Sequence, residues 1–583
     1  MIAGKQVRAF PLRIWAPDAA KVEGVLEHRR VPLERLEGGW WRSAERLPAG
    51  TDYRFSVDGG EPLPSPRARW QPHGVHGPSR MLDPGSFEWS DGGWKPPPLA
   101  DGVVYEAHIG TFSAQGTFEG AIGHLDSLVE LGVTHLELMP VAEFSGEHGW
   151  GYDGVDLYAP HAAYGGPNGL WRLVDAAHAR GLAVLLDVVY NHLGPTGNYL
   201  GRFGPYFTDR YSTPWGSAVN FDGPDSDEVR RFFIDNALMW LRDYHLDGLR
   251  LDAVHAIFDM SAVHFLEQLT AEVRQLEAEL GRSLVVIAES DLNDPRLVAD
   301  VARGGYGMDA QWSDDFHHAL HSVLTGERTG YYEDFGTLGD LATTLGQGYR
   351  YAGDYSAFRR RRHGRPNPEL DGSRMLGYLQ NHDQVGNRAL GERSAELMSE
   401  GRLMIGAAVV LTAPFVPMLF QGEEWAASTP FQYFTDHHDP ELGRAVSEGR
   451  RTEFAAFGWQ PESVPDPQDR ATFEASRLNW SERDRPDHAR MLDWHRRLIR
   501  LRAEYPELRD GRLDRDAVES DDEGGWLRYR RGRIEVAFNV GAESRRLDVD
   551  PAATVLLASD ERIGLDDGSL ELPADTVAVL ATT

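Results

Sequence analysis

The chain has 583 residues and a formal net charge of −31, from 59 Lys and Arg against 90 Asp and Glu. This length exceeds one ordinary hydrophobic core and predicts about three domains. The negative charge repels phosphate backbones and anionic lipid headgroups, which argues against nucleic acid and membranes as partners. The chain has no cysteine, so disulfides, thiolate nucleophiles and Cys-ligated zinc are excluded.

The N-terminal residues, MIAGKQVRAFPLRIWAPDAA, lack the apolar segment of a secretory signal. No run of about 18 or more apolar residues, the length needed to cross a bilayer, occurs in the sequence. We therefore expect a soluble cytoplasmic monomer that acts on a small-molecule substrate.

Residues 1–97 consist of short alternating stretches separated by turn residues, such as PLRIWAP, KVEGVLE and YRFSVDGGEP. This pattern predicts an N-terminal, immunoglobulin-like β-sandwich. The segment WKPPPLADG at 94–102 is rich in proline and predicts a stiff linker.

From residue 103 onward, short apolar segments alternate with segments of helical periodicity. The predicted strands are 103–109, 134–140, 182–190, 248–254, 284–290, 308–313, 374–381 and 417–425. Eight such units in series predict an α/β fold, a (β/α)8 TIM barrel over residues 98–510. Short alternating strands return at about residue 511 and predict a C-terminal antiparallel β domain over 511–583.

Two long insertions interrupt the predicted barrel, at 191–226 after the third strand and at 426–486 after the eighth. Loops of this size at the carboxyl ends of strands are where a barrel enzyme builds its active site.

Charged side chains mark the C-terminal ends of several predicted strands. Arg250 and Asp252 lie two residues apart in the apolar run HLDGLRLDAVHAI, so their side chains share one face of the strand. Glu289 ends the fifth strand and Asp383 follows the seventh. Because the C-terminal strand ends meet at one rim of a barrel, we expect Asp252, Glu289 and Asp383 to converge.

Each of these residues also has a structural explanation. A single Asp at a strand end often caps a helix or forms a turn. Arg250 can form a structural ion pair with Asp252 or with Asp187. The acidic residues of DDFHH at 314–318 suit a helix N-terminus. The recurrence of carboxylates on three strands at one rim favours a catalytic site over these alternatives.

Two carboxyl groups that face one cavity are what glycoside cleavage requires. Arg250 favours the ionised form of Asp252, which makes Asp252 the candidate nucleophile. Glu289 follows the apolar segment LVVIA, and this setting favours a protonated carboxyl that serves as general acid/base. Asp383 is expected to bind sugar hydroxyls and to stabilise the positive charge of the transition state.

The remaining polar and aromatic side chains of this rim also suit a sugar. His192 and His382 can hydrogen-bond hydroxyl groups. The side chains expected to face the C–H surfaces of pyranose rings are Trp150, Tyr152, Trp215, Phe316 and the aromatics of PFQYF.

Four segments resemble, in this order, the signature regions of the α-amylase superfamily, glycoside hydrolase family 13. They are DVVYNH at 187–192, GLRLDAVH at 248–255, VIAES at 286–290 and NHDQVGN at 381–387. The resemblance implies a retaining mechanism in which Asp252, Glu289 and Asp383 have the roles assigned above.

Further segments are similar to those of the superfamily members that hydrolyse the α-1,4 bond between trehalose and a maltooligosaccharide. These segments are 66–80, 148–160, 312–321 and 421–437. The resemblance implies a substrate site lined by Arg250 to His255, Asp314 to His318 and His382 to Asn387. The predicted substrate-binding set is Arg250, His255, His192, Asp187, Tyr152, Asp314, Asp315, Phe316, His317, His318, His382, Gln384 and Asn387.

Many amylases hold calcium near the motif that here contains Asn191, but no acidic loop with calcium-ligand spacing is evident in this sequence. We therefore predict no metal and no cofactor. The nearest alternative is a glycogen branching enzyme, which has the same three carboxylates but transfers the sugar to a hydroxyl group. Two others are a metal-dependent barrel, which would need His-x-His or His-Glu-x-x-His at the rim, and a non-catalytic glycan-binding protein.

Overall fold

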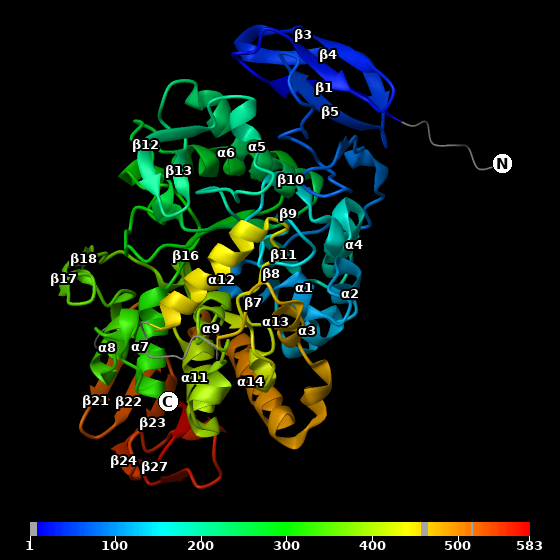
Figure 1. The fold of residues 1–583 in the computed structure, drawn as a ribbon. Helices are drawn as coiled ribbons and strands as arrows, with labels where there is room; N and C mark the ends of the chain where they lie inside the picture. The colour runs from blue at the N-terminus through cyan, green and yellow to red at the C-terminus, as the bar shows by residue number, and fades with distance from the viewer. Residues whose placement is uncertain (1–7, 456–463, 515–516, 583) are drawn as a thin grey trace.

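The computed structural model describes residues 8–455, 464–514 and 517–582 (Figure 1). An N-terminal β-sheet lies at one end of the molecule, a barrel lies in the middle, and the C-terminal sheets lie at the other end. The part of the predicted 426–486 insertion at 456–463 lies outside the described residues, as do 1–7, 515–516 and 583 of the predicted terminal domains.

The N-terminal part is a six-stranded antiparallel sheet. Its strands, in spatial order, are β1 (Ala9–Trp15), β4 (Trp40–Pro48), β3 (Arg30–Arg35), β2 (Val22–Val25), β5 (Asp52–Val57) and β6 (Ser79–Arg80). In β3, Val31 and Leu33 are buried while their neighbours are exposed, which is the alternation expected of a strand with one wet face.

Eight parallel strands close into a barrel, as predicted. They are β7 (Val104–Ala107), β8 (His135–Leu138), β11 (Ala183–Val188), β14 (Gly248–Leu251), β15 (Val285–Ala288), β16 (Ala310–Trp312), β19 (Met375–Gly377) and β20 (Val416–Phe420). Each lies within or overlaps one of the predicted segments. The strands are almost wholly buried because helices cover their outer side and side chains fill the interior.

The outer layer consists of amphipathic helices. The longer ones are α4 (Gly166–His178), α5 (Ser226–Asp243), α6 (Phe265–Leu280), α7 (Asp314–Thr325), α11 (Glu400–Thr412) and α14 (Pro486–Glu504). In α6, Phe265, Leu269, Val273 and Leu276 recur at helical spacing and are buried. Helix α11 is apolar nearly all round because it contacts both α14 and the C-terminal strand β28 (Thr576–Ala581).

Both predicted insertions contain secondary structure. The first holds the hairpin β12 (Phe207–Thr213) and β13 (Gly216–Val219), and the second holds α12 (Pro440–Ala455) and α13 (Arg470–Ala475). Two further insertions were not predicted. One follows β8 and contains β9 (Ala142–Glu143) and β10 (Asp156–Pro160). The other contains α8 (Leu338–Gln347) and the hairpin β17 (Ala352–Ser356) and β18 (Arg361–Gly364).

The C-terminal part is antiparallel, as predicted. A five-stranded sheet has the order β21 (Val518–Asp521), β22 (Trp526–Arg531), β23 (Ile534–Asn539), β28 and β25 (Thr554–Ala558). A three-stranded sheet consists of β24 (Arg545–Asp548), β27 (Ser569–Leu572) and β26 (Gly564–Asp566). Among the helices of the described residues, none is long and apolar enough to cross a membrane.

Candidate active site

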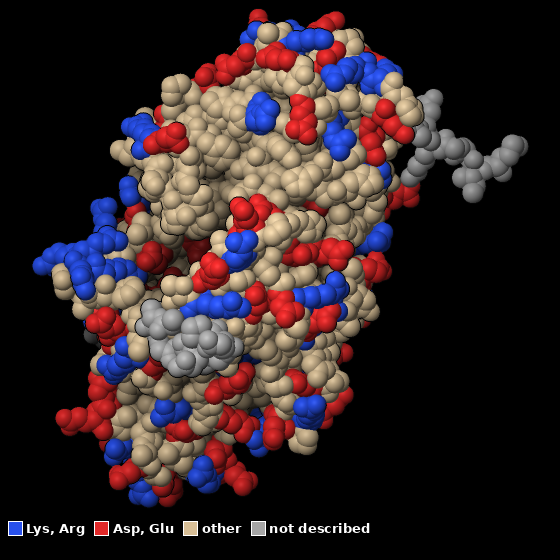
Figure 2. Space-filling model, viewed as in Figure 1, with Lys and Arg blue, Asp and Glu red and all other residues tan. Residues whose placement is uncertain are grey.

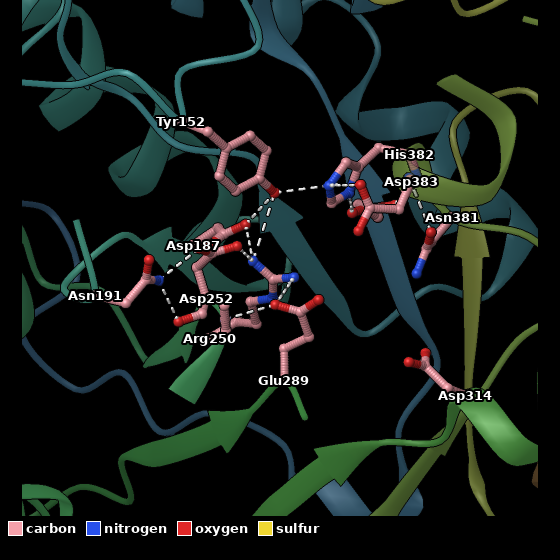
Figure 3. A network of polar contacts seen from close by, with 12 residues as sticks. Tyr152, Asp187, Asn191, Arg250, Asp252, Glu289, Asp314, Asn381, His382 and Asp383 are labelled. Carbon is pink, nitrogen blue, oxygen red and sulfur yellow. Dashed lines mark hydrogen bonds and ion pairs between the residues drawn. The ribbon is translucent and has the colours of Figure 1, made fainter. Parts of the chain in front are cut away.

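Strand β14 places Arg250 inside the barrel, where its side chain is fully buried. One terminal nitrogen, Nη1, donates to Asp187 Oδ2 at 2.5 Å and to Asp252 Oδ1 at 3.1 Å. The other, Nη2, lies 3.0 Å from Glu289 Oε2. Carboxylates within β11 and directly after β14 and β15 therefore share one guanidinium (Figure 3). The guanidinium also packs against the face of the Trp312 ring, with its carbon 4.1 Å from the ring centroid.

Both oxygens of Asp252 are held by the protein. Oδ1 faces Arg250, and Asn191 Nδ2 donates to Oδ2 at 2.7 Å and to the Asp252 carbonyl oxygen at 2.8 Å. Asn191 belongs to the loop that follows β11, so the third and fourth strands fix this carboxylate together. Because the two bonds fix both ends of the group, its orientation is set before a substrate binds.

The backbone turn after Asp252 brings Glu289 to the same place. Ala253 has a φ of 39°, a left-handed conformation, and its N–H donates to Glu289 Oε2 at 2.6 Å. Asp252 and Glu289 thus lie on the same rim. They are close together because each contacts a terminal nitrogen of the same Arg250 guanidinium. The contact of Arg250 with Glu289 was not foreseen, since the sequence argument paired Arg250 with Asp252. The protonation of Glu289 stays a prediction.

Asp383 approaches from the opposite side of the site, in the short helix α9 (His382–Gly386) (Figure 3). The Asn381 side chain caps this helix by accepting from the backbone N–H groups of Asp383 at 2.9 Å and Gln384 at 3.2 Å. The Asp383 side chain keeps 39% of its surface exposed, so a ligand can reach it. Asn387 Nδ2 donates to Asp383 Oδ1 at 3.3 Å and is itself exposed.

The buried surroundings shift the pKa values of three groups at this site. Burial raises the pKa of Asp187 to about 7, although Arg250 opposes the rise. Burial also raises the pKa of Asp314 to about 7, against a 2.5 Å hydrogen bond from the Tyr378 hydroxyl. Burial lowers the pKa of His192 to about 4, so this ring is neutral at pH 7.

A cavity of about 540 Å³ lies beside Tyr152, whose hydroxyl donates to Asp187, and it reaches the insertions after β11 and β20. Its lining includes Trp150, Tyr152, His192, Trp215 and Tyr433. The Trp215 ring is half exposed and stacks on His192, with the centroids 4.1 Å apart. In the space-filling view, acidic side chains appear at the bottom of a recess in the visible face (Figure 2). The cavity thus offers aromatic walls beside acidic groups, a combination that suits a sugar chain.

Comparison with known proteins identifies the family. Residues 82–204 match the family described as the catalytic domain of alpha amylase. The chain is 50% identical to a malto-oligosyltrehalose trehalohydrolase of Rhizobium sp. (strain M-11) over 97% of both proteins. It is 52% identical to the protein of that name from Arthrobacter ramosus, over 92% of this chain and 93% of that one. The chain belongs to the malto-oligosyltrehalose trehalohydrolase family.

A solved structure agrees with this assignment. The crystal structure of a Salmonella typhimurium protein that carries an α-amylase assignment is 37% identical, with a TM-score of 0.90 over 99% of this chain and 100% of that one. The malto-oligosyltrehalose trehalohydrolase family consists of glycoside hydrolases, so the chain is an enzyme of this class.

In this member of the trehalohydrolase family, the segment DDFHH does not line the site as a whole, which corrects the sequence prediction. Phe316 and His317 are fully buried. Phe316 packs on Phe415 with ring centroids 5.0 Å apart, and His317 Nε2 bonds the Tyr332 hydroxyl at 2.9 Å. The residues begin helix α7, where each step turns the side chain by about 100°, so neighbours cannot all face the rim.

Two further residues of this segment are engaged with neighbouring loops. Asp315 Oδ2 accepts from Asn293 Nδ2 at 2.7 Å and from the Arg350 backbone N–H at 2.7 Å, which fixes those loops. His318 is buried and stacks on Tyr331, with the centroids 4.9 Å apart. Asp314 is left as the residue of the segment whose carboxyl points toward the other acidic groups (Figure 3).

The other predicted residues lie near the carboxylates with different degrees of exposure. Tyr152 donates to Asp187 Oδ2 at 2.5 Å and its ring lines the cavity. His255 is exposed just beyond the turn after Asp252, and Gln384 is partly buried in α9. His382 is fully buried beneath the site, where its ring contacts Tyr152.

Glu106, which was not predicted as a site residue, is a carboxylate buried in β7 whose two oxygens contact His382. A signal for it existed, because Glu106 is a lone charge in the apolar segment VVYEAHI, as Arg250 is in its own strand. No polar pattern marks Trp312, whereas Tyr433 is one of the predicted aromatics of PFQYF and lines the cavity. Among the described residues, no group of three or more His, Asp or Glu side chains could hold a metal ion.

Proposed function

We propose that this chain is a retaining glycoside hydrolase that cleaves the α-1,4-glucosidic bond next to the trehalose unit of maltooligosyl trehalose. The products are trehalose and a maltooligosaccharide. The observation that carries the proposal is the guanidinium of Arg250, which contacts Asp252 and Glu289 from neighbouring strands at one rim. The substrate is inferred from the names of relatives that are similar to this chain over nearly its whole length.

Asp252 is the nucleophile in this proposal. It attacks the anomeric carbon while Glu289 gives its proton to the oxygen of the leaving sugar, so the glycosidic bond breaks as the Asp252–carbon bond forms. Arg250 and Asn191 hold the attacking carboxylate in place. Glu289 then takes a proton from water, the resulting hydroxide attacks the same carbon, and the Asp252–carbon bond breaks. Two inversions leave the new hydroxyl in the α configuration.

Asp383 stabilises the transition state. The reacting ring carries positive charge midway through each step, and Asp383 faces Asp252 and Glu289 across the site (Figure 3). Its exposed carboxyl can also accept hydrogen bonds from ring hydroxyls. Asp314, His255, Gln384 and Asn387 are proposed to bind the remaining hydroxyls, while Tyr152 and Trp215 offer aromatic faces to the sugar. His192 is not assigned this role, because its ring nitrogens face Asn191 Oδ1 and the Tyr152 carbonyl oxygen.

Product analysis tests this proposal. The chain is incubated with maltooligosyl trehalose and, separately, with amylose, and the products are separated and followed by proton NMR. We expect free trehalose from the first substrate and a reducing end that appears first as the α anomer. New α-1,6 branches on amylose without trehalose would instead support a branching enzyme. A β anomer would contradict retention, and binding without turnover would support a glycan-binding protein.

A further inference from the structure

A buried ion pair lies beneath the site, between Glu106 of the first barrel strand, β7, and His382 at the start of helix α9, which follows the seventh strand. The Glu106 carboxylate contacts His382 twice. Oε1 faces the ring nitrogen Nδ1, and Oε2 accepts from the His382 backbone N–H at 2.9 Å. Both side chains are 1% exposed. Since one contact fixes the backbone and the other fixes the ring, the pair leaves His382 a single orientation.

The other ring nitrogen of His382 continues the chain of contacts toward the reacting groups. Nε2 lies 2.8 Å from the Tyr152 hydroxyl, and that hydroxyl donates to Asp187 Oδ2, which also binds Arg250 (Figure 3). The hydrogen of the Tyr152 hydroxyl is donated to Asp187, so this hydroxyl accepts a hydrogen bond from Nε2–H of His382. Nδ1 faces a carboxylate and needs a proton as well. Both ring nitrogens are donors only in the imidazolium form.

Several charged or titratable groups face the His382 ring from the surrounding elements. They are Glu106 and His108 from β7 and the turn after it, Glu137 from β8, Tyr152 from the loop after β8, Arg250 from β14, and Asp383 from its own helix. Burial lowers the pKa of His382, but Glu106 and then Asp383 outweigh it and raise this pKa to about 9. The geometry and the charge balance thus agree on a cationic ring at pH 7.

We infer that Glu106 is a positioning residue, which holds His382 as a cation and through it fixes Tyr152, Asp187 and Arg250 against the two reacting carboxylates. Glu106 itself has no path to the substrate, because it is buried below His382. The inference rests on the proposed function for its catalytic consequence. It predicts a polarised series of hydrogen bonds from β7 to β14. The Tyr152 ring stacks on His382 in this series, with the centroids 5.2 Å apart.

The variant Glu106→Gln tests this inference, and Glu137→Gln is its matched control. Gln keeps the size of the side chain but removes the negative charge. Glu137 pairs with Glu106 across the two strands and is equally buried, but no hydrogen bond or ion pair joins it to His382 in the described part of the chain, and burial raises its pKa well above the usual range. We expect Glu106→Gln to lower kcat about 100-fold at pH 8 with little change in KM, because a small misplacement of reacting groups has this cost. The loss shrinks as the pH falls and the ring regains its proton. Glu137→Gln keeps a native-like kcat.

Histidine NMR provides a second measurement that needs no substrate. With 15N-labelled histidine, the His382 signals are identified by their loss in His382→Asn. We expect both ring nitrogens to carry protons at pH 7.5 in the native chain and in Glu137→Gln, and to titrate at least one pH unit lower in Glu106→Gln. If the native chain released no trehalose, the proposed function would fail while this titration still reported on the pair.

A double variant separates positioning from general damage to the fold. If Glu106 acts through His382, Glu106→Gln with His382→Asn is no slower than His382→Asn alone. Independent, additive losses in the double variant contradict the inference. A neutral His382 ring in the native chain at pH 7.5 also contradicts it, and this result does not depend on whether any variant folds.

Discussion

At Arg250, one guanidinium buried in the barrel contacts the carboxylates of Asp187, Asp252 and Glu289. A buried charge costs free energy unless it is paired, so this cation and its carboxylates depend on one another. The arrangement explains why an apolar strand keeps a charged residue pair. It also means that the two proposed reacting groups share a partner, so a change at either one alters the setting of the other.

The first prediction concerns the proposed nucleophile. Asp252→Asn keeps the shape of the side chain and its contact with Asn191, but the amide cannot form the glycosyl intermediate. We expect kcat to fall by several orders of magnitude, with the melting temperature and substrate binding largely kept. Trehalose release and calorimetric binding measure the two effects. Asp487→Asn, at a side chain that is 90% exposed, is the control. Near-native turnover by Asp252→Asn would exclude the mechanism.

The second prediction concerns the pH dependence of stability at Asp314. Its pKa in the folded chain is raised to about 7, whereas an unfolded Asp has about 3.9. The folded chain therefore binds this proton more strongly, and the stability it contributes is present below about pH 4 and is lost as the pH rises through about 7.

Asp314→Asn cannot lose a proton and keeps an oxygen that accepts from Tyr378. Relative to the native chain, we expect an unchanged melting temperature at pH 4 and a rise of about 1–3 °C at pH 8. Thermal melts at both pH values, with Asp487→Asn beside them, provide the measurement. A difference that is the same at pH 4 and pH 8 would show that the Asp314 proton is not its source.

At the scale of elements, the two ends of strand β14 have different tasks. The C-terminal end presents Arg250 and Asp252 to the site, and the N-terminal end begins just after Asp247, which is 2% exposed. Asp247 accepts from Trp94 Nε1 at 2.8 Å and Arg282 Nη1 at 2.6 Å, and it lies 2.9 Å from His178 Nε2. These contacts join the linker, helix α4 and the start of β15 at the bottom of the barrel. In barrels of this fold, residues at the C-terminal ends of the strands carry the chemistry, and residues at the N-terminal ends contribute to stability.

The third prediction follows from this difference. Asp247→Ala leaves Arg282, His178 and the Trp94 N–H without their buried acceptor, and we expect a loss of about 3–5 kcal/mol in the free energy of unfolding. Urea denaturation followed by tryptophan fluorescence measures it. At a temperature where the variant is folded, kcat is expected to stay native-like. Loss of kcat in a variant of native stability would place Asp247 in the catalytic machinery instead.

At the scale of the whole molecule, the barrel places its long insertions around one rim, and several of them line the cavity beside Tyr152. The loop after β8 supplies Tyr152, the loop after β11 supplies His192 and Trp215, and the segment after β20 supplies Tyr433. Each is far from the others in sequence. The site therefore depends on closure of the barrel, which brings the carboxyl ends of all strands together.

The fourth prediction concerns divalent metal ions in the intact chain. Asn191 is the residue at the position where many amylases bind calcium, but its amide oxygen faces His192 Nδ1 at 2.5 Å and its amide nitrogen binds Asp252. Both ends of this amide are thus engaged within the protein. We expect exhaustive chelation to leave trehalose release and the melting temperature unchanged. An activity that is lost on chelation and restored only by calcium would overturn this prediction.

Local pattern in the sequence was enough to locate the barrel strands and the antiparallel C-terminal part, because apolar runs and turn residues depend on near neighbours. It was also enough to select Asp252, Glu289 and Asp383 as candidates, because strand ends of a parallel barrel share one rim. These three roles are still proposals. The structure brings their side chains to one rim, as the sequence argument required.

Tertiary structure alone decided the contacts between distant segments. Glu106 and His382 are separated by 276 positions, and Tyr152 and His382 by 230, so no local pattern could pair them. The same holds for the contact between Arg250 and Glu289, and for the burial of Phe316 and His317 within a segment expected to line the site. The physical reason is that periodicity fixes which face a residue occupies on its own element, whereas only packing of the closed barrel fixes what that face meets.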